Sequence, residues 1–175
     1  MVDKTEPFRL ENHSVQVRNL ETEFHLTDCG NAERFANQHS KTFRFCSDLR
    51  QWLYFDTQRW NTLEGQDKAR QTAIKIAREM LVEASKIEEK SERKKLADWA
   101  FHSESSHHIA AMLSLAQSLP GIVCYSREFD RNPDIVTCLN GTIDLRTGEL
   151  LPHRPEDLIT KLLPVIYDPN AKFDL

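Results

Sequence analysis

The sequence predicts an α+β protein in which β-hairpin-rich segments flank a small helical bundle. Aromatic residues alternate with polar ones between positions 43 and 60, a pattern typical of strands. Apolar residues then recur at three- and four-residue steps from 69 to 119, which indicates helices. The turn signals Asn140-Gly141 and Thr147-Gly148 lie between short apolar runs and predict a β-meander.

The first expected element is a short helix in the stretch LTDCGNAERFANQHS. Thr27 or Asp28 can cap its first turn through a side-chain oxygen. Its apolar side consists of Ala32, Phe35 and Ala36. This spacing places all three on one face of a helix, so the helix is expected to pack on a core.

An aromatic hairpin is expected next. Phe43 and Phe45 alternate with Arg44, and the run Trp52–Phe55 precedes a four-residue turn and Trp60. Aromatic residues with period-two alternation favour strands, and the turn between them favours an antiparallel pair.

Three helices are expected between residues 66 and 119. The first carries apolar residues at helical spacing, namely Ala69, Ala73, Ile76, Ala77, Met80, Leu81, Ala84 and Ile87. The second carries Leu96, Trp99 and Ala100. The third carries Ile109, Met112, Leu113, Ala116 and Leu119, and Pro120-Gly121 ends it. The short connections between these helices indicate that they pack together as a bundle.

The meander is expected to contain three short strands. Asn140-Gly141 favours a type I′ turn, because both positions accept a positive φ, and it joins Ile135–Leu139 to Thr142–Leu145. Thr147-Gly148 then turns the chain toward Glu149–Pro152.

Composition limits the class of protein. The chain has 175 residues, of which 39% are hydrophobic and 29% charged, as in a soluble globular domain. Its apolar runs are too short for a membrane span, and its start has no apolar signal-peptide core, so a cytoplasmic protein without a membrane partner is expected. Its four cysteines form no CxxC pair and are expected to be reduced, buried thiols.

Several kinds of catalytic site are missing from the sequence. None of the five glycines is followed by lysine, so a Walker phosphate loop is excluded, and no G-x-G-x-x-G is present. No aspartates stand in a D-x-D arrangement for metal-dependent nucleotide transfer. His107 and His108 are adjacent and would point about 100° apart on a helix, which favours a capping or surface role over a metal site. No catalytic residue and no metal ligand is therefore assigned.

The aromatic hairpin has two interpretations. Its candidate nucleic-acid contacts are Arg44, Arg50, Trp52, Arg59 and Trp60, since aromatic rings can stack on bases and arginines can bind phosphates. Alternatively, the tryptophans pack in a core and the arginines solvate the other face, which is the favoured interpretation. The net charge of −4 also argues against a dedicated nucleic-acid-binding module. The lysines between residues 86 and 95 alternate with glutamates, which favours a solvated helix face over a phosphate patch.

Two blocks carry a resemblance to a known family. They are the block T-D-x-G-N-A-E-R in the first helix and the block N-G-x-x-D-L-R-T-G-E-L in the meander, with the aromatic hairpin and helices between them. In this order they resemble the accessory domain that precedes the superfamily-3 helicase in phage and plasmid DNA primase-helicases and in poxvirus primase-helicases. The resemblance runs from about Leu26 to Asn170.

The resemblance implies a division of the chain. Residues 1–25 form a poorly defined N-terminal segment, residues 26–170 form the accessory domain, and residues 171–175 lead toward a helicase domain that the chain does not contain. The resemblance also implies candidate interaction or structural positions in the two blocks, namely Asp28, Asn31, Glu33, Arg34, Asn140, Asp144, Arg146 and Thr147. The family's tryptophan hairpin commonly turns through glycine, which Asp56-Thr57-Gln58 lacks, so a longer and looser turn is expected here.

The leading functional hypothesis is a noncatalytic replication module. It would couple to a superfamily-3 helicase domain in cis or form the collar of its ring, would contact DNA weakly or indirectly, and would belong to an oligomer in the full-length protein. ATP and magnesium are implied for the parent helicase, and no cofactor for this chain. Two alternatives stay open: a metal-dependent nucleotidyl-transfer or nuclease fragment, and a stand-alone regulator that binds a replication protein.

Overall fold

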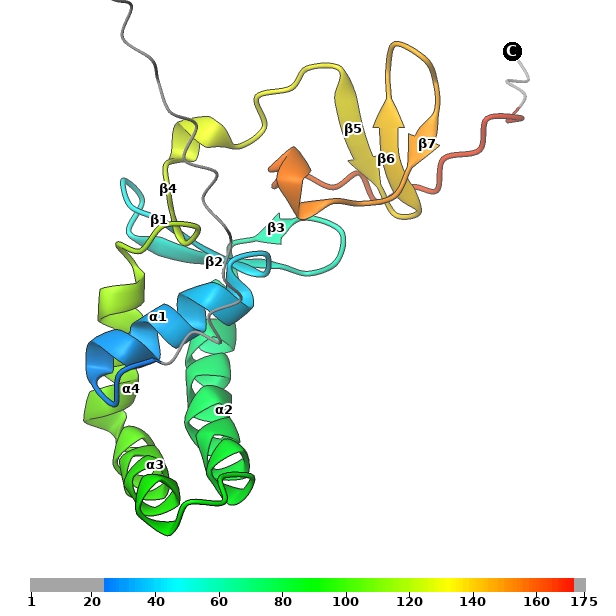
Figure 1. Cartoon of the computed structure of the whole chain (residues 1–175). Coiled ribbons are helices and arrows are strands. Elements are labelled where there is room, and N and C mark those ends of the chain that lie inside the picture. Colours follow the sequence, from blue (N-terminus) through cyan, green and yellow to red (C-terminus); the bar gives the residue numbers. More distant parts are fainter. Residues whose placement is uncertain (1–23, 172–175) are drawn as a thin grey trace, which may run out of the picture.

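The computed structural model describes residues 24–171 and confirms the α+β class. Four helices lie on one side of a four-stranded sheet, and a separate three-stranded sheet lies on the other side (Figure 1). The helices are α1 (Asp28–His39), α2 (Gly65–Ser85), α3 (Lys90–Ser103) and α4 (Ser106–Ala116). Of the expected segment 1–25, all but the last two residues lie outside the described part of the chain.

Helix α1 begins as its sequence predicts. The side-chain oxygen of Thr27 accepts a hydrogen bond from the backbone N–H of Gly30 at 3.1 Å, so Thr27 is the N-cap. Ala32, Phe35 and Ala36 are buried, which confirms the apolar side of this helix.

The first sheet has the strand order β3-β2-β1-β4. Its strands are β1 (Phe43–Cys46), β2 (Gln51–Phe55), β3 (Trp60–Asn61) and β4 (Val123–Cys124). The first three are antiparallel, as the aromatic alternation predicts. Strand β4 was not predicted: it pairs in parallel with β1, far along the chain, and its two residues carry no pattern of their own.

The main core lies between this sheet and the helices. The rings of Phe35, Phe43 and Trp52 meet there with centroid distances of 5.4 to 6.3 Å. Helix α2 starts directly against β2, and a Cβ atom on Gly65 would lie 2.0 Å from the carbonyl oxygen of Trp52. Only glycine allows this approach, so it fixes the position of α2 on the sheet.

The residues that the bundle buries follow the helical spacing of apolar residues in the sequence. The buried residues of α2 are Gly65, Ala69, Ala73, Ile76, Ala77, Met80 and Ala84. Helix α2 ends at Ser85, so Ile87 lies in the joint to α3, and Leu119 likewise lies beyond the end of α4. None of the helices in the described part is long and apolar enough to cross a membrane.

The second sheet is the predicted meander. It consists of β5 (Ile135–Cys138), β6 (Gly141–Asp144) and β7 (Leu150–Leu151), in that order. The expected type I′ turn at Asn140-Gly141 was wrong: Cys138 pairs with Gly141, so Leu139 and Asn140 form the loop, and neither has a positive φ. Gly141 is needed in the strand instead, because a Cβ there would lie 2.6 Å from the carbonyl oxygen of Leu151.

The segment that follows β7 joins the two sheets. It contains a short 3-10 helix, Pro155–Asp157, and a second one, Ser126–Glu128, follows β4. The backbone N–H of Trp60 donates a hydrogen bond to the carbonyl oxygen of Ile159 at 2.8 Å, and its indole N–H donates to the carbonyl oxygen of Pro155 at 2.9 Å. Residues 155–160 therefore hold the meander against the edge strand β3 (Figure 1).

The last described residues run beside β5. The N–H of Leu163 donates to the carbonyl of Thr137, and the N–H of Leu139 donates to the carbonyl of Val165, each at 2.9 Å. Cys138 and Leu163 also form a parallel bridge. We call residues 163–167 the exit segment. Its backbone lies beside β5 and is hydrogen-bonded to it, although it is not a strand of the sheet.

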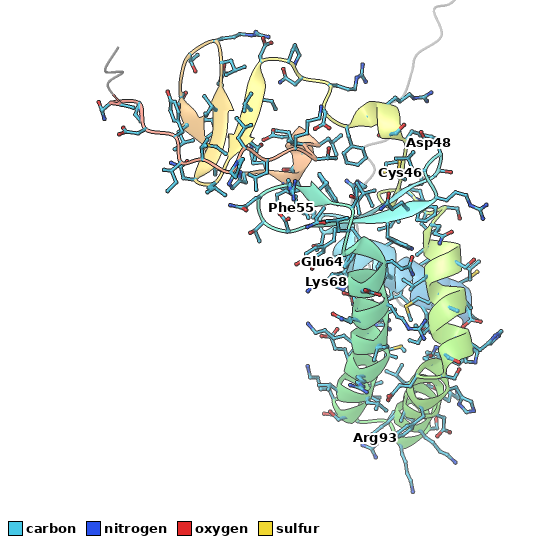
Figure 2. All side chains as sticks on the ribbon, turned by 180° about the vertical axis from the view of Figure 1, so that it is seen from behind. Cys46, Asp48, Phe55, Glu64, Lys68 and Arg93 are labelled. Carbon is cyan, nitrogen blue, oxygen red and sulfur yellow. The ribbon has the colours of Figure 1, made fainter. Side chains whose placement is uncertain are left out.

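The cysteines are free but not all buried. Cys46, Cys124 and Cys138 are buried, whereas Cys29 is exposed on the first turn of α1, so the expectation of four buried thiols was wrong for that residue. Cys46 and Cys124 are register partners on β1 and β4 (Cys46 is labelled in Figure 2). Burial raises the pKa of the Cys46 thiol and raises that of Cys124 to about 12.

Candidate interface and nucleic-acid contact residues

Three side chains of the T-D-x-G-N-A-E-R block in α1 each contact a different helix. Asp28 Oδ1 lies 2.7 Å from Nδ1 of His108 in α4. The amide of Asn31 donates to Ser103 Oγ of α3 at 2.9 Å. These contacts make the block a junction between helices that are distant in the sequence.

The third of these side chains is Arg34. Its guanidinium binds both carboxylate oxygens of Glu83 in α2, at 2.8 and 2.7 Å, and lies over the ring of Phe24. Arg34 is 9% exposed. Glu33 differs from the other block residues, because it is exposed and lines an open hollow of about 410 Å³ with Phe24 and Leu119. Asp28, Asn31 and Arg34 are thus bound within the fold, and Glu33 faces solvent.

The block in the meander shapes its turns and fixes the exit segment. Asn140 donates its amide to the carbonyl of Tyr167 at 3.0 Å and accepts from the N–H of Tyr167 at 2.9 Å. Asp144 accepts from the N–H of Arg146 at 2.8 Å, and the Arg146 guanidinium pairs with Asp134. Thr147 Oγ1 accepts from the N–H of Glu149 at 3.2 Å. Each of the four candidate residues has an internal partner.

The two tryptophans of the aromatic hairpin belong to the core. Trp52 and Trp60 are each 1% exposed. Trp52 contacts Phe35, Phe43 and Phe45, and Trp60 contacts Phe55 and Phe129. A base cannot stack on either ring unless the core opens, so their burial supports the packing interpretation.

Two of the three arginines around the hairpin are bound within the fold. The guanidinium of Arg44 contacts the carbonyl oxygens of Ser40 and Gly121 and lies 5.3 Å from the Trp60 ring, and burial lowers its pKa. Arg59 donates to the carbonyl of Thr160 at 3.3 Å. Only Arg50 is exposed, in the turn between β1 and β2.

The hairpin turn is tight without a glycine, so the expected looser turn was wrong. Asp56 and Arg59 close it through a backbone hydrogen bond of 3.0 Å, and Thr57 takes the left-handed conformation with φ 76°. Asp56 Oδ1 accepts from the N–H of Gln58 and of Arg59, at 3.1 and 2.9 Å. The aspartate side chain thus stabilises a backbone conformation that usually favours glycine.

Within residues 24–171, no group of three or more His, Cys, Asp or Glu side chains is placed to hold a metal ion. Asp28 and Glu33, the acidic residues of the first block, belong to no such group. His107 and His108 lie with ring centroids 5.4 Å apart, and the second of them is bound to Asp28.

Sequence reasoning missed the apolar surface of the meander. Large aliphatic side chains there are 36% to 72% exposed, and they are Leu139, Leu145, Leu150, Leu163, Val165 and Ile166. We call this set the meander face. The signal was available in the run LLPVI, which is more apolar than an ordinary solvent-facing segment.

Comparison with known proteins places these features in a family. The model of the family described as D5 N terminal like matches residues 32–175, which is most of the chain and includes both sheets. A search of curated proteins found no match.

Proposed function

Since the chain belongs to the D5 N-terminal-like family, the N-terminal domain of phage and plasmid primase-helicases, we propose that it is a noncatalytic module for DNA replication. It couples to a superfamily-3 helicase domain in cis and contributes to the collar of the helicase ring. ATP and magnesium act in the helicase domain under this proposal, and this chain supplies contacts. Oligomerisation belongs to the full-length protein.

The meander face is the observation that carries the proposal. Six large exposed aliphatic side chains within one small sheet and the segment beside it are uncommon on a domain that has no partner, and exposed apolar surface marks protein–protein contact sites. Leu139 and Val165 of this face are joined by a backbone hydrogen bond, so they lie side by side. Ile166, at 72% exposure, is the most exposed member.

The exit segment supports the same proposal. Its five residues are held by backbone bonds to β5 and by the paired hydrogen bonds between Asn140 and Tyr167. Tyr167 also donates its hydroxyl to the carbonyl of Gly148 at 2.9 Å. A segment held in this way presents Val165 and Ile166 in a fixed orientation, which lowers the entropic cost of docking.

The test is an association experiment between this chain and the helicase domain of the same primase-helicase, supplied as a separate polypeptide. We expect a complex in a solution mass measurement, and we expect the double substitution Val165→Ser with Ile166→Ser to weaken it. The matched control is Leu49→Ser with Leu63→Ser, which removes two aliphatic side chains that are 60% and 87% exposed outside the meander face. Separate elution of the two polypeptides, or equal loss with the control pair, contradicts the proposal.

A further inference from the structure

Exposed cations gather at the end of the α2–α3 hairpin. Lys86 follows the last turn of α2, and Lys90, Arg93 and Lys94 lie on the first turns of α3. All four side chains are exposed. Figure 2 shows Arg93 at this end of the hairpin, on the far side of the bundle from both sheets. We call these four residues the hairpin tip.

Most of the acidic neighbours of the hairpin tip are already bound. The carboxylate of Glu89 is the N-cap of α3: it accepts from Ser91 Oγ at 2.7 Å and from the N–H of Glu92 at 2.6 Å. These hydrogen bonds lower the pKa of Glu89 to about 2. Glu92 in turn pairs with Lys95 at 2.7 Å, and Glu83 pairs with Arg34.

Glu88 is the acidic residue of this stretch for which the described contacts show no partner. Residues 86–95 contain five lysines and arginines and three glutamates, so this stretch carries a net charge of +2 although the whole chain carries −4.

An exposed aromatic side chain lies on the same side of α3 as two of the lysines. Lys90, Lys94 and Phe101 are spaced i, i+4 and i+11, which places them along one line of the helix surface. Phe101 is 66% exposed. Its ring is therefore open to solvent, unlike those of Trp52 and Trp60.

Helix α2 extends this surface. Arg78 of α2 lies 3.4 Å from Glu104, which caps the C-terminus of α3 three residues after Phe101. Val82 is one turn beyond Arg78, so it lies on the same face of α2, and it is 56% exposed. One side of α3 thus carries Lys90, Lys94 and Phe101, with the exposed Asp98 between the last two. Lys86 and Arg93 lie at the tip of the same hairpin, and Val82 is exposed on α2.

We infer that this outer surface of the α2–α3 hairpin binds single-stranded nucleic acid, with the cations of the hairpin tip on phosphates and Phe101 stacked on a base. Single-strand binding without sequence preference combines a cationic track with an exposed aromatic ring, and both are present here. The inference deepens the proposed function and rests on it, since it gives the replication module its own contact with DNA. An acidic protein segment could also pair with these cations, but it has no base to stack on Phe101, so the exposed ring favours nucleic acid as the ligand.

The test uses fluorescence anisotropy with two labelled probes, an oligothymidylate and an abasic strand with the same number of phosphates. We expect the chain to bind the oligothymidylate at low salt, and we expect Phe101→Ala to weaken that binding by about fivefold or more, the lower end of what one stacked base contributes. The same substitution should leave the affinity for the abasic strand unchanged.

Charge reversal tests the cations. Lys90→Glu with Lys94→Glu should lower the salt slope of log K by about 1.4, which corresponds to two phosphate contacts on a single strand. The matched control, Lys41→Glu with Arg131→Glu, makes the same change in net charge at exposed positions near the sheets. Glutamate in the first turns of α3 is compatible with the helix dipole, so the fold is retained; Lys90→Gln with Lys94→Gln provides a milder second variant.

The possible outcomes separate the two proposals. An unchanged oligothymidylate affinity in Phe101→Ala, an equal loss in the control pair, or no binding at low salt overturns the inference. The coupling proposal is tested through Val165 and Ile166 on the meander face, so it survives or fails independently of these measurements.

Discussion

The side-chain oxygen of Asn31 accepts a hydrogen bond from the indole N–H of Trp99 at 3.1 Å, while the amide nitrogen of the same side chain donates to Ser103. Asn31 is 1% exposed. A buried amide is stable only when its donor and its acceptor are both satisfied. This single side chain therefore joins α1 to two positions on α3.

We expect Asn31→Ala to lower the free energy of unfolding by about 1–3 kcal/mol, since it leaves the polar groups of Trp99 and Ser103 without their partner. Denaturant unfolding measures the change. Asn37→Ala is the matched control, because Asn37 lies on the same helix and is exposed; its midpoint should stay close to that of the unchanged chain. Equal midpoints for the two variants would show that the Asn31 hydrogen bonds contribute nothing.

Trp99→Ala should lower the free energy of unfolding by about 3 kcal/mol, the lower end for a large aromatic truncation, because the ring is only partly buried. Trp99 packs on the main core and meets the ring of His108 at 5.3 Å. Its effect should not add to that of Asn31→Ala, since the two residues share a hydrogen bond. Strict additivity in the double variant would argue against this coupling.

Stability should fall in alkaline solution because of the buried thiol of Cys124. Burial raises its pKa from about 9 to about 12, so the folded state holds a proton that the unfolded state releases. The stabilisation is complete below about pH 9 and is lost as the pH rises toward about 12. Denaturant midpoints at several alkaline pH values measure the slope, and Cys124→Ala should make it shallower. If stability falls with pH as steeply in Cys124→Ala as in the unchanged chain, the Cys124 thiol is not the cause of the loss.

Asn140→Ala should loosen the exit segment without unfolding the domain. The substitution removes both hydrogen bonds to Tyr167. We expect faster hydrogen exchange in residues 161–170 and a change in global stability of about 0.5–1.5 kcal/mol at most. Asn170→Ala is the control, since it is exposed in the same region. Unchanged exchange in Asn140→Ala would mean that the backbone bonds to β5 suffice.

The purified chain should hydrolyse no ATP and synthesise no primer, because its sequence has no phosphate loop and no D-x-D arrangement. Activity assays with magnesium present measure this. Turnover that follows the chain through purification and disappears in Asp28→Ala or Glu33→Ala would instead favour the nucleotidyl-transfer alternative.

The elements that local spacing specifies were predictable from the sequence. The cap at Thr27, the buried side of α2 and the meander strands all follow from patterns within a few residues. Strand β4 was not predictable, because its two residues are strands only through pairing with β1. The exit segment is similar: Pro164 and its neighbours lie beside β5 because Thr137 and Leu139 hold them there.

The sequence singled out the residues of the two blocks, but it could not show which contacts they make. Asn31 and Ser103 are 72 positions apart, so no local pattern could show that the first block joins helices. The turn at Asn140-Gly141 was mispredicted for a related reason. Local preference favours a glycine in the loop, but the close approach of Leu151 requires it in the strand.

The junction at α1 also sets an order of events during synthesis. Glu83, Ser103 and His108 follow their partners in α1 by 49, 72 and 80 residues. Helix α1 leaves the ribosome well before the three helices that complete it, and contacts of such long sequence separation form slowly. Until α4 emerges, Phe35 of the nascent α1 can pack on Phe43 and Trp52, but α1 still lacks its contacts with the later helices. This interval is when the chain is most exposed to misassociation and to capture by chaperones.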